Sequence, residues 1–241
     1  MYFLSIESST KIFSLAVSNN EKVLRFRNLK ANQVLEDSII PAVNRLLLSA
    51  GVPFEKLDAF VVGLGPGSFT SLRIGLSTVK AFAMATGKPI AGIGSLDTIA
   101  ARLANEDCDE ICVISDARRN LVYSALFKKN GQGLERQGDY QLSSLAAVLD
   151  RVHGRTLFAG DALALYQKDI EHIYRESCRR KETPCQALFT SEKFWFPEGR
   201  QLAKLAYERL CRKNFDDPAT LAPVYLYAPD CQVTNHNTPG K

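Results

Sequence analysis

Three short runs of apolar residues, separated by tight polar turns, occupy the first thirty positions. The runs are YFLSIES, IFSLAVSN and KVLRFRN, and the turns between them are residues 8–11 and 19–21. Runs of this length bounded by turn-forming residues predict β-strands. Because the two connections are so short, consecutive strands must be antiparallel neighbours. The pattern therefore predicts a three-stranded meander over residues 2–28.

Two helical repeats follow, each next to a short buried strand. Residues 34–50 carry apolar side chains at helical spacing and stop at Gly51, and Pro41 is expected to kink or shift the start of this helix. The remaining expected elements of the first half are a strand at 59–65, apolar on both faces, a helix at 70–86 ending at Gly87, a strand at 89–94 and a helix at 95–104 capped by Ser95. Up to the helix at 70–86, the order is βββαβα.

The second half repeats this order. It offers strands at 111–118, 120–129 and 134–142, a helix at 143–152 and a strand at 155–163. A shift of 109 residues places Asp116 on Glu7, as an internal duplication would. We therefore divide the chain into residues 1–106 and 107–241, expect the last helix, 200–212, to pack back on the first half, and expect the tail from 228 to fray.

Composition narrows the class of protein. With 46% apolar residues in 241, the chain has enough material for a substantial core, and its net charge of +4 is too small to indicate nucleic-acid binding by itself. No run reaches the roughly 18 apolar residues of a membrane span, and the N-terminus lacks a signal-peptide pattern. We expect a cytoplasmic protein whose six cysteines, none in a CxxC pair, are reduced, and no histidine-based metal site.

The string GLGPGSFTSLRIG, residues 63–75, lies between a buried strand and a helix. Glycines at such a turn, followed by the free N–H groups of a helix, are typical of phosphate binding. The alternative is a tight turn in which Gly67 serves geometry and Ser68 or Thr70 caps the helix, since the string matches neither common phosphate-loop pattern.

The hairpin ESSTK, residues 7–11, is a second candidate. A strand-end acid with a hydroxyl-rich turn can contact a metal and phosphates between two lobes, but the same residues also make an ordinary polar hairpin. The matching turn SDARRN, residues 115–120, offers Asp116 with two arginines, as a phosphate clamp or as a solvated turn. No nucleophile with a base is found. Both long helices are apolar around much of their circumference, which favours burial against a partner or within the same chain.

Four stretches resemble one known family. LSIESSTKIFSLAVSNNEKV, GLGPGSFTSLRIGLSTVKAFA, ISDARRNLVYSALF and the late APVYL are similar to the TsaB (YeaZ) family, the dimerisation subunits of the bacterial machinery that makes threonylcarbamoyladenosine (t6A) in tRNA. The resemblance extends to about Leu226, and GPGSFT followed by LRIG is its most specific part. It implies an α/β, actin-like (ASKHA, RNase H-type) fold of two duplicated βββαβα lobes.

The resemblance also implies a role. Such a chain is a non-catalytic scaffold that pairs with the paralogue TsaD, whose HxxxH metal pair is missing here, and joins TsaE in a larger ATP-dependent complex. That complex modifies N6 of adenosine 37 in tRNAs reading ANN codons. We expect no cofactor held stably by the chain alone, ATP or ADP with Mg²⁺ at the interface with TsaD, and indirect contact with tRNA. A homodimer of the isolated chain is left open.

Carried over residue by residue, the resemblance implies two sites and no catalytic or metal-binding residue. A nucleotide-binding or interface loop comprises Glu7, Ser8, Ser9, Gly65, Gly67, Ser68, Thr70 and Arg73. A surface for TsaD comprises Leu35, Ile39, Val43, Leu46, Leu47, Leu72, Leu76, Val79 and Phe82. The chain departs from the usual pattern at Glu7 and Ser8 (Asp and Thr), Asn32 and Gln33 (His with Thr or Ser), Ser71 (Gly) and Tyr227 (Arg).

The rival hypothesis is an independent small-molecule kinase of the same superfold. Such kinases hold ATP between two lobes with an acid at the end of a strand in each. Glu7 and Asp116 supply the acids, but only AGDAL, residues 159–163, resembles an adenosine loop.

Overall fold

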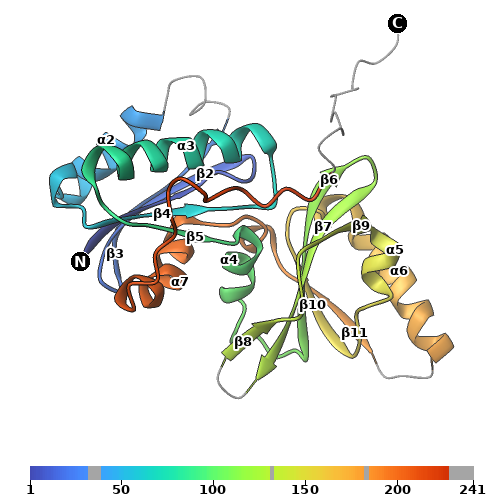
Figure 1. Cartoon of the computed structure of the whole chain (residues 1–241). Coiled ribbons are helices and arrows are strands. Elements are labelled where there is room, and N and C mark those ends of the chain that lie inside the picture. Colours follow the sequence, from blue (N-terminus) through green and yellow to red (C-terminus); the bar gives the residue numbers. More distant parts are fainter. Residues whose placement is uncertain (32–38, 131–132, 182–184, 228–241) are drawn as a thin grey trace, which may run out of the picture.

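The computed structural model describes residues 1–31, 39–130, 133–181 and 185–227, with the side chains of 177–181 left out. It forms two sheets joined side by side (Figure 1). The first sheet contains β1 (Tyr2–Glu7), β2 (Ile12–Asn19), β3 (Lys22–Lys30), β4 (Ala59–Gly63) and β5 (Ile90–Ile93) in the order β3-β2-β1-β4-β5. The second contains β6 (Glu110–Arg118), β7 (Leu121–Asn130), β8 (Gly133–Arg136), β10 (Arg155–Ala159) and β11 (Gln186–Phe189) in the order β11-β10-β6-β7-β8, with β9 (Gln141–Ser144) also on β7.

The two sheets repeat one topology. In each, an antiparallel meander is followed by two strands that lie parallel to the meander's first strand. Parallel neighbours need a crossover, and helices supply it in both halves. The meander over residues 2–28, the repeat after 109 residues and the α/β class are thereby confirmed.

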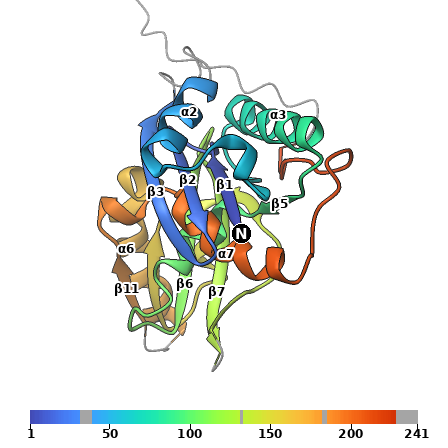
Figure 2. The same ribbon diagram turned by 90° about the vertical axis from the view of Figure 1, so that its left-hand side faces the viewer.

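Helices cover both faces of the first sheet. α2 (Ile39–Ala50) and α3 (Phe69–Thr86) lie side by side on one face, and α7 (Gly199–Cys211) covers the other (Figures 1 and 2). α7 contributes Leu202, Ala203 and Ala206 to a cluster with β1, β4 and β5. The expected return of the last helix onto the first half is confirmed, because its apolar stripe fits the otherwise bare face.

The helices that pack on the second sheet include α5 (Leu145–Leu149) and α6 (Leu163–Lys181). α4 (Ser95–Ala101) precedes the predicted boundary at 106 yet packs Leu96 and Ile99 into the core under the second sheet. The two halves are thus connected by packing as well as by the chain, while the boundary itself stays a prediction. Short 3₁₀ turns lie at Phe54–Lys56 and Glu192–Phe194.

Several expectations need correction. The weak strand expected at 134–142 is two strands, β8 and β9, because Gly138 takes a positive φ of 77° and breaks the run. Ser95 is the first residue of its helix, with Gly94 at the cap. α6 and β11 were not expected, although Tyr166, Ile170 and Tyr174 recur at helical spacing. Residues 34–38 of the expected first helix, Asn32, Gln33 and the tail from 228 lie outside the described residues.

Three further expectations concern Pro41, the cysteines and membrane-spanning segments. Pro41 is the third residue of α2 within the described range Ile39–Ala50. Cys108, Cys112 and Cys211 are free thiols, but Cys185 is disulfide-bonded, so the expectation of six reduced cysteines is wrong for it. Within the described ranges, no helix is long and apolar enough to cross a membrane.

Candidate functional site

The carboxylate of Glu7 is buried where three segments meet. It ends β1 and is 0% exposed. The Ser9 amide donates to Oε1 at 2.7 Å, and the Ser95 hydroxyl donates to Oε2 at 2.9 Å. That hydroxyl in turn accepts the Gly65 amide at 3.0 Å. Glu7 therefore joins the hairpin, the glycine loop and α4.

Burial also changes the acidity of this group. Loss of water raises the pKa of Glu7 above its ordinary value of 4.5, and the hydrogen bonds from Ser9 and Ser95 only partly oppose the shift. A Cβ at Gly63 would lie 2.1 Å from Oε2 of Glu7. The backbone of β4 therefore packs directly against this carboxylate oxygen. The carboxylate is not open to a metal ion, which removes one of the two acids that the kinase hypothesis requires.

The glycine loop packs directly on the 7–11 hairpin. The Ser68 amide donates to the Ser9 carbonyl at 2.7 Å. A Cβ at Gly67 would lie 2.2 Å from that carbonyl oxygen, and one at Gly75 would lie 2.2 Å from Ser8 Oγ. Two glycines of the string therefore permit close approach of loop and α3 to the hairpin. This observation favours the packing interpretation of the motif over a phosphate cradle.

The start of α3 carries hydroxyls but no side-chain cap. Ser68 is the N-cap residue without a capping bond, and its Oγ lies 3.0 Å from the Oγ of Ser71. Ser71, which stands where glycine is usual, is buried. Behind them, the hydroxyls of Ser8 and Ser9 are buried without a hydrogen-bond partner among the described residues.

A cavity of about 640 Å³ opens beside this start. It is lined by Thr10, Lys11, Ile12, Lys30, Ala31, Ser68, Ser71 and Arg118. It therefore lies between the first hairpin, α3 and the β6–β7 turn of the other sheet. Of the eight residues predicted for nucleotide binding, only Ser68 lines it.

Arg73 has a different neighbourhood from the cavity. Its guanidinium lies 3.8 Å from the ring centre of Phe69, and its Nε donates to the Tyr225 hydroxyl at 2.9 Å. Two residues on, the Tyr227 hydroxyl donates to the Ala117 carbonyl at 2.7 Å. The segment after α7 thus runs from α3 to the end of β6 as a strap (Figure 1). Tyr227, where arginine is usual, serves as its anchor on the second sheet.

The side chains predicted to meet a partner face inward. Six of them, Ile39, Val43, Leu46, Leu47, Leu76 and Val79, are buried in the core between α2, α3 and the first sheet. Leu72 is buried too, but outside that cluster, and Phe82 is half-buried against it. Leu35 lies outside the described residues. Their stripe matches the apolar face of the sheet, so it is satisfied within the chain. Seven of the nine residues predicted for the surface are therefore buried in the chain by itself, while the surface stays a prediction.

The opposite faces of the same helices do expose apolar groups. Leu48 on α2 is 81% exposed and Met84 on α3 is 77% exposed. Ala81 and Ala85 are exposed beside Met84. A sequence pattern cannot separate these positions from the buried ones when both stripes are apolar, because only the location of the sheet decides which stripe turns inward.

Known proteins resemble this chain in sequence. Residues 30–222 match the family model described as TsaD, tRNA N6-adenosine threonylcarbamoyltransferase. The tRNA threonylcarbamoyladenosine biosynthesis protein TsaB of Bacillus subtilis is 32% identical over 178 residues, covering 72% of this chain and 76% of that protein. Its Escherichia coli K12 namesake is 28% identical over 135 residues, covering 56% and 58%.

Solved structures resemble it in fold. YeaZ from Pseudomonas aeruginosa superposes with a TM-score of 0.74 at 22% identity, covering 93% of this chain and 99% of that one. A ROK family protein from Streptococcus pneumoniae TIGR4, in complex with sucrose, gives a TM-score of 0.50 at 11% identity, covering 88% and 100%. At these identities the likeness concerns the fold alone. The fold is the actin-like, duplicated α/β fold that the sequence analysis predicted.

Proposed function

Because this chain belongs to the TsaD family and, within it, to the TsaB proteins, we propose that it is the non-catalytic subunit that pairs with a TsaD protein. The chain takes part in the biosynthesis of t6A in tRNA. In the proposed role it acts in the cytoplasm and supports a partner that transfers the threonylcarbamoyl group to N6 of adenosine 37 in tRNAs reading ANN codons.

The proposed pairing with TsaD rests on the outer face of α2 and α3. Leu48 and Met84 are large apolar side chains exposed to more than three quarters of their area, on two neighbouring helices. Exposed apolar groups that gather on one face are typical of protein interfaces. The inner faces of both helices are already buried on the first sheet, so a partner would complete a second packing layer.

The burial of Glu7 supports a role without independent catalysis. Its two oxygens are used by Ser9 and Ser95, so it supplies neither a base nor a metal ligand. We propose further that the chain alone binds no nucleotide stably, and that ATP or ADP with Mg²⁺ binds only where TsaD adds its own residues. TsaE joins that pair in an ATP-dependent complex, and without TsaD the same helices pair two copies of this chain.

The test is complex formation by variants of the outer face. Leu48→Glu and Met84→Glu, each mixed with TsaD from the same organism, are measured by size-exclusion chromatography with light scattering. Because burying an unpaired carboxylate is strongly unfavourable, each variant is expected to weaken the pair at least tenfold. Leu165→Glu is the matched control, since Leu165 is 62% exposed on α6 of the other half.

The tRNA product gives the second readout. Cells carrying only Leu48→Glu are expected to contain less t6A than cells carrying Leu165→Glu. An unchanged complex and unchanged t6A for both outer-face variants would disprove the interface. Steady ATP-dependent phosphorylation of a metabolite by the purified chain alone would instead revive the kinase hypothesis.

A further inference from the structure

The outer edge of the first sheet carries a row of positive charges. β3 is its edge strand, and Lys22, Arg25, Arg27 and Lys30 are exposed along a sequence, KVLRFRNLK, that contains no acid. At about 3.3 Å per residue, the row is roughly 26 Å long. The strand's geometry therefore spreads four cations along one side of the molecule.

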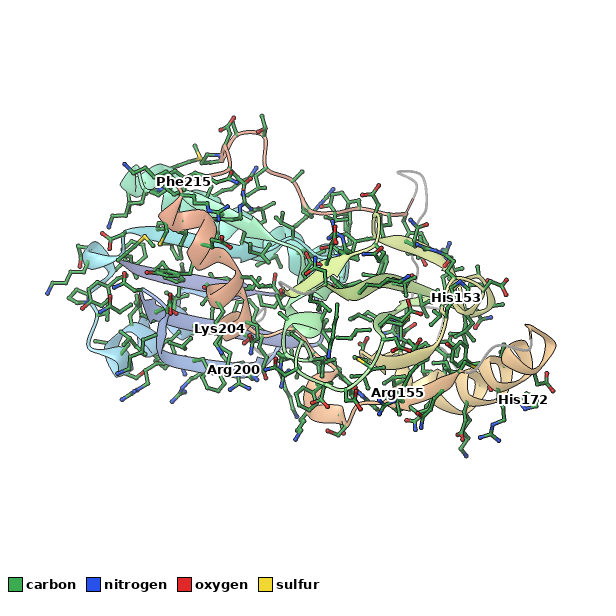
Figure 3. The ribbon with its side chains drawn as sticks, turned by 90° about the horizontal axis from the view of Figure 1, so that it is seen from below. His153, Arg155, His172, Arg200, Lys204 and Phe215 are labelled. Carbon is green, nitrogen blue, oxygen red and sulfur yellow. The ribbon has the colours of Figure 1, made fainter. Side chains whose placement is uncertain are left out.

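Charges stand on both faces of this edge. Arg25 and Arg27 lie opposite Val17 and Leu15, whose side chains belong to the core under α2. Phe26 points to the α7 side, is 42% exposed, and has the Arg200 guanidinium 4.6 Å from its ring centre. Figure 3 shows Arg200 and Lys204 on α7 across this face of the sheet. An exposed ring beside cations is a feature of surfaces that bind RNA.

The row leads into the cavity described above. Lys30 lines that cavity together with Lys11 and Arg118, and three hydroxyl side chains, those of Thr10, Ser68 and Ser71, line it too. Lys30 pairs with Ile12 across the strands, so it lies next to Lys11 in the sheet. Arg118 Nη1 lies 3.4 Å from Asp116 Oδ2, and the Arg118 side chain is 71% exposed whereas that of Asp116 is 16% exposed. Because the arginine lies largely in water, the attraction is partly screened and Arg118 can still contact a ligand.

Edge protection is the simpler explanation of charges on an outer strand, because they discourage pairing with another sheet. It accounts for Arg25 and Arg27. It does not account for cations and hydroxyls that meet in a cavity between two sheets, or for an aromatic ring kept exposed beside Arg200. The charges along β3 and those in the cavity together fit one ligand that is long, negatively charged and rich in phosphate oxygens.

We propose that this basic edge, defined as Lys22, Arg25, Arg27 and Lys30 with Lys11 and Arg118 of the cavity, binds the sugar-phosphate backbone of the tRNA directly. The proposal rests on the function proposed above, which supplies tRNA as the substrate of the assembly. Phosphate contacts of this kind fix the position of an RNA without reading its sequence. The basic edge would thus orient the tRNA on the complex.

The test compares tRNA binding by complexes built with two double variants. Arg25→Glu/Arg27→Glu reverses two charges of the basic edge yet leaves the edge strand charged, so protection against aggregation is retained. Lys168→Glu/Lys213→Glu makes the same change in net charge on exposed lysines of α6 and of the loop after α7. Each is mixed with TsaD, and the Kd for a tRNA reading an ANN codon is measured by anisotropy at several salt concentrations.

The first variant is expected to weaken binding at least tenfold at 0.1 M salt. It should also lower the slope of log K against log salt by about 1.4 to 1.8, since each lost phosphate contact removes roughly 0.7 to 0.9. The control variant should bind as the native chain does, and Arg25→Lys/Arg27→Lys should retain binding. These results together would support the basic edge.

Three results would overturn it. Equal binding by Arg25→Glu/Arg27→Glu and the native chain would show that RNA does not touch the edge. Equal loss in the control variant would show that only net charge matters. Loss of binding to phosphatidylserine vesicles with unchanged tRNA binding would assign the charges to a lipid surface. If no complex with TsaD formed, the proposed function would fail, and the same titration on the chain alone would still test the edge.

Discussion

The role of Glu7 is difficult to predict from its position in the sequence. An acid at the end of a first strand, followed by hydroxyls, predicts a ligand site, yet its oxygens accept hydrogen bonds from Ser9 and Ser95 inside the protein. The acid holds the hairpin to α4 and the glycine loop. A buried carboxylate of this kind affects stability rather than ligand binding, and its titration gives a test.

The pKa of Glu7 is raised by burial, so the folded protein holds this proton more tightly than the unfolded chain does. The resulting contribution to stability is fully present below pH 4.5 and is lost as the pH rises through the folded-state pKa. The difference in unfolding free energy between the native chain and Glu7→Gln should therefore fall as the pH rises above 4.5. Urea titrations between pH 4.5 and 7.5 measure it, and a constant difference would contradict the assignment.

Gly67 gives a second test at the scale of the residue. A methyl group there would meet the Ser9 carbonyl oxygen at 2.2 Å, and backbone cannot move aside as a side chain can. Gly67→Ala should lower the free energy of unfolding by about 1–3 kcal/mol, measured in urea. For comparison, Gly51→Ala meets no atom within 4 Å but keeps a φ of 65°, and should lower it by roughly 1–2 kcal/mol through strain alone. A Gly67→Ala protein as stable as the native one would show that the loop is not tightly packed.

At the scale of the element, α2 and α3 each have two apolar stripes with different roles. The inner stripe is buried on the sheet, while the outer stripe exposes Leu48 and Met84. The chain's own stability should depend on the first and complex formation on the second.

Two leucines of α2 separate these roles. Leu46 is 0% exposed and Leu48 is 81% exposed. Leu46→Ala should lower the free energy of unfolding by about 2–5 kcal/mol, because it leaves a cavity. Leu48→Ala should change it by no more than about 0.5 kcal/mol. Chemical denaturation measures both, and a Leu48→Ala protein destabilised like Leu46→Ala would mean that the outer face packs within the isolated chain.

At the scale of the whole molecule, the two halves are joined by a buried charge cluster. Glu198, just before α7, lies 3.6 Å from Arg102, which follows α4, and both side chains are less than 10% exposed. Arg102 also donates to the carbonyls of Lys193 and Phe196, while Glu198 accepts from Asn28 and pairs with Arg200. Burial lowers the pKa of Arg102, and the Glu198 charge opposes that shift.

Removing one member of this cluster should strongly destabilise the folded protein. Glu198→Ala leaves the Arg102 charge buried, and should lower the free energy of unfolding by about 3–5 kcal/mol. Adding Arg102→Met should restore a large part of the loss, since the orphan charge disappears. A double-mutant cycle in urea measures the coupling, and simple additivity of the two losses would argue against a direct ion pair.

Most of the strands, helices α2 and α3, the duplication and the family were determined by the sequence alone, whereas α6, β11 and the division into β8 and β9 were not. Alternating and helical runs of apolar residues are local signals, and a string such as GPGSFT with LRIG is local too. The polar helix α6 was not predicted because its apolar positions are few. The break at Gly138 was not predicted because its positive φ is set by the strands around it.

The roles of the site residues were decided only by the tertiary structure. Whether Glu7 faces solvent or protein depends on Gly63 and Ser95, which are distant in sequence. Which stripe of α2 turns inward depends on where the sheet lies, and the meeting of Lys30 with Arg118 depends on the packing of the two sheets. Local pattern fixes what a segment is, whereas burial and proximity are properties of the whole fold, and they decide what its side chains can do.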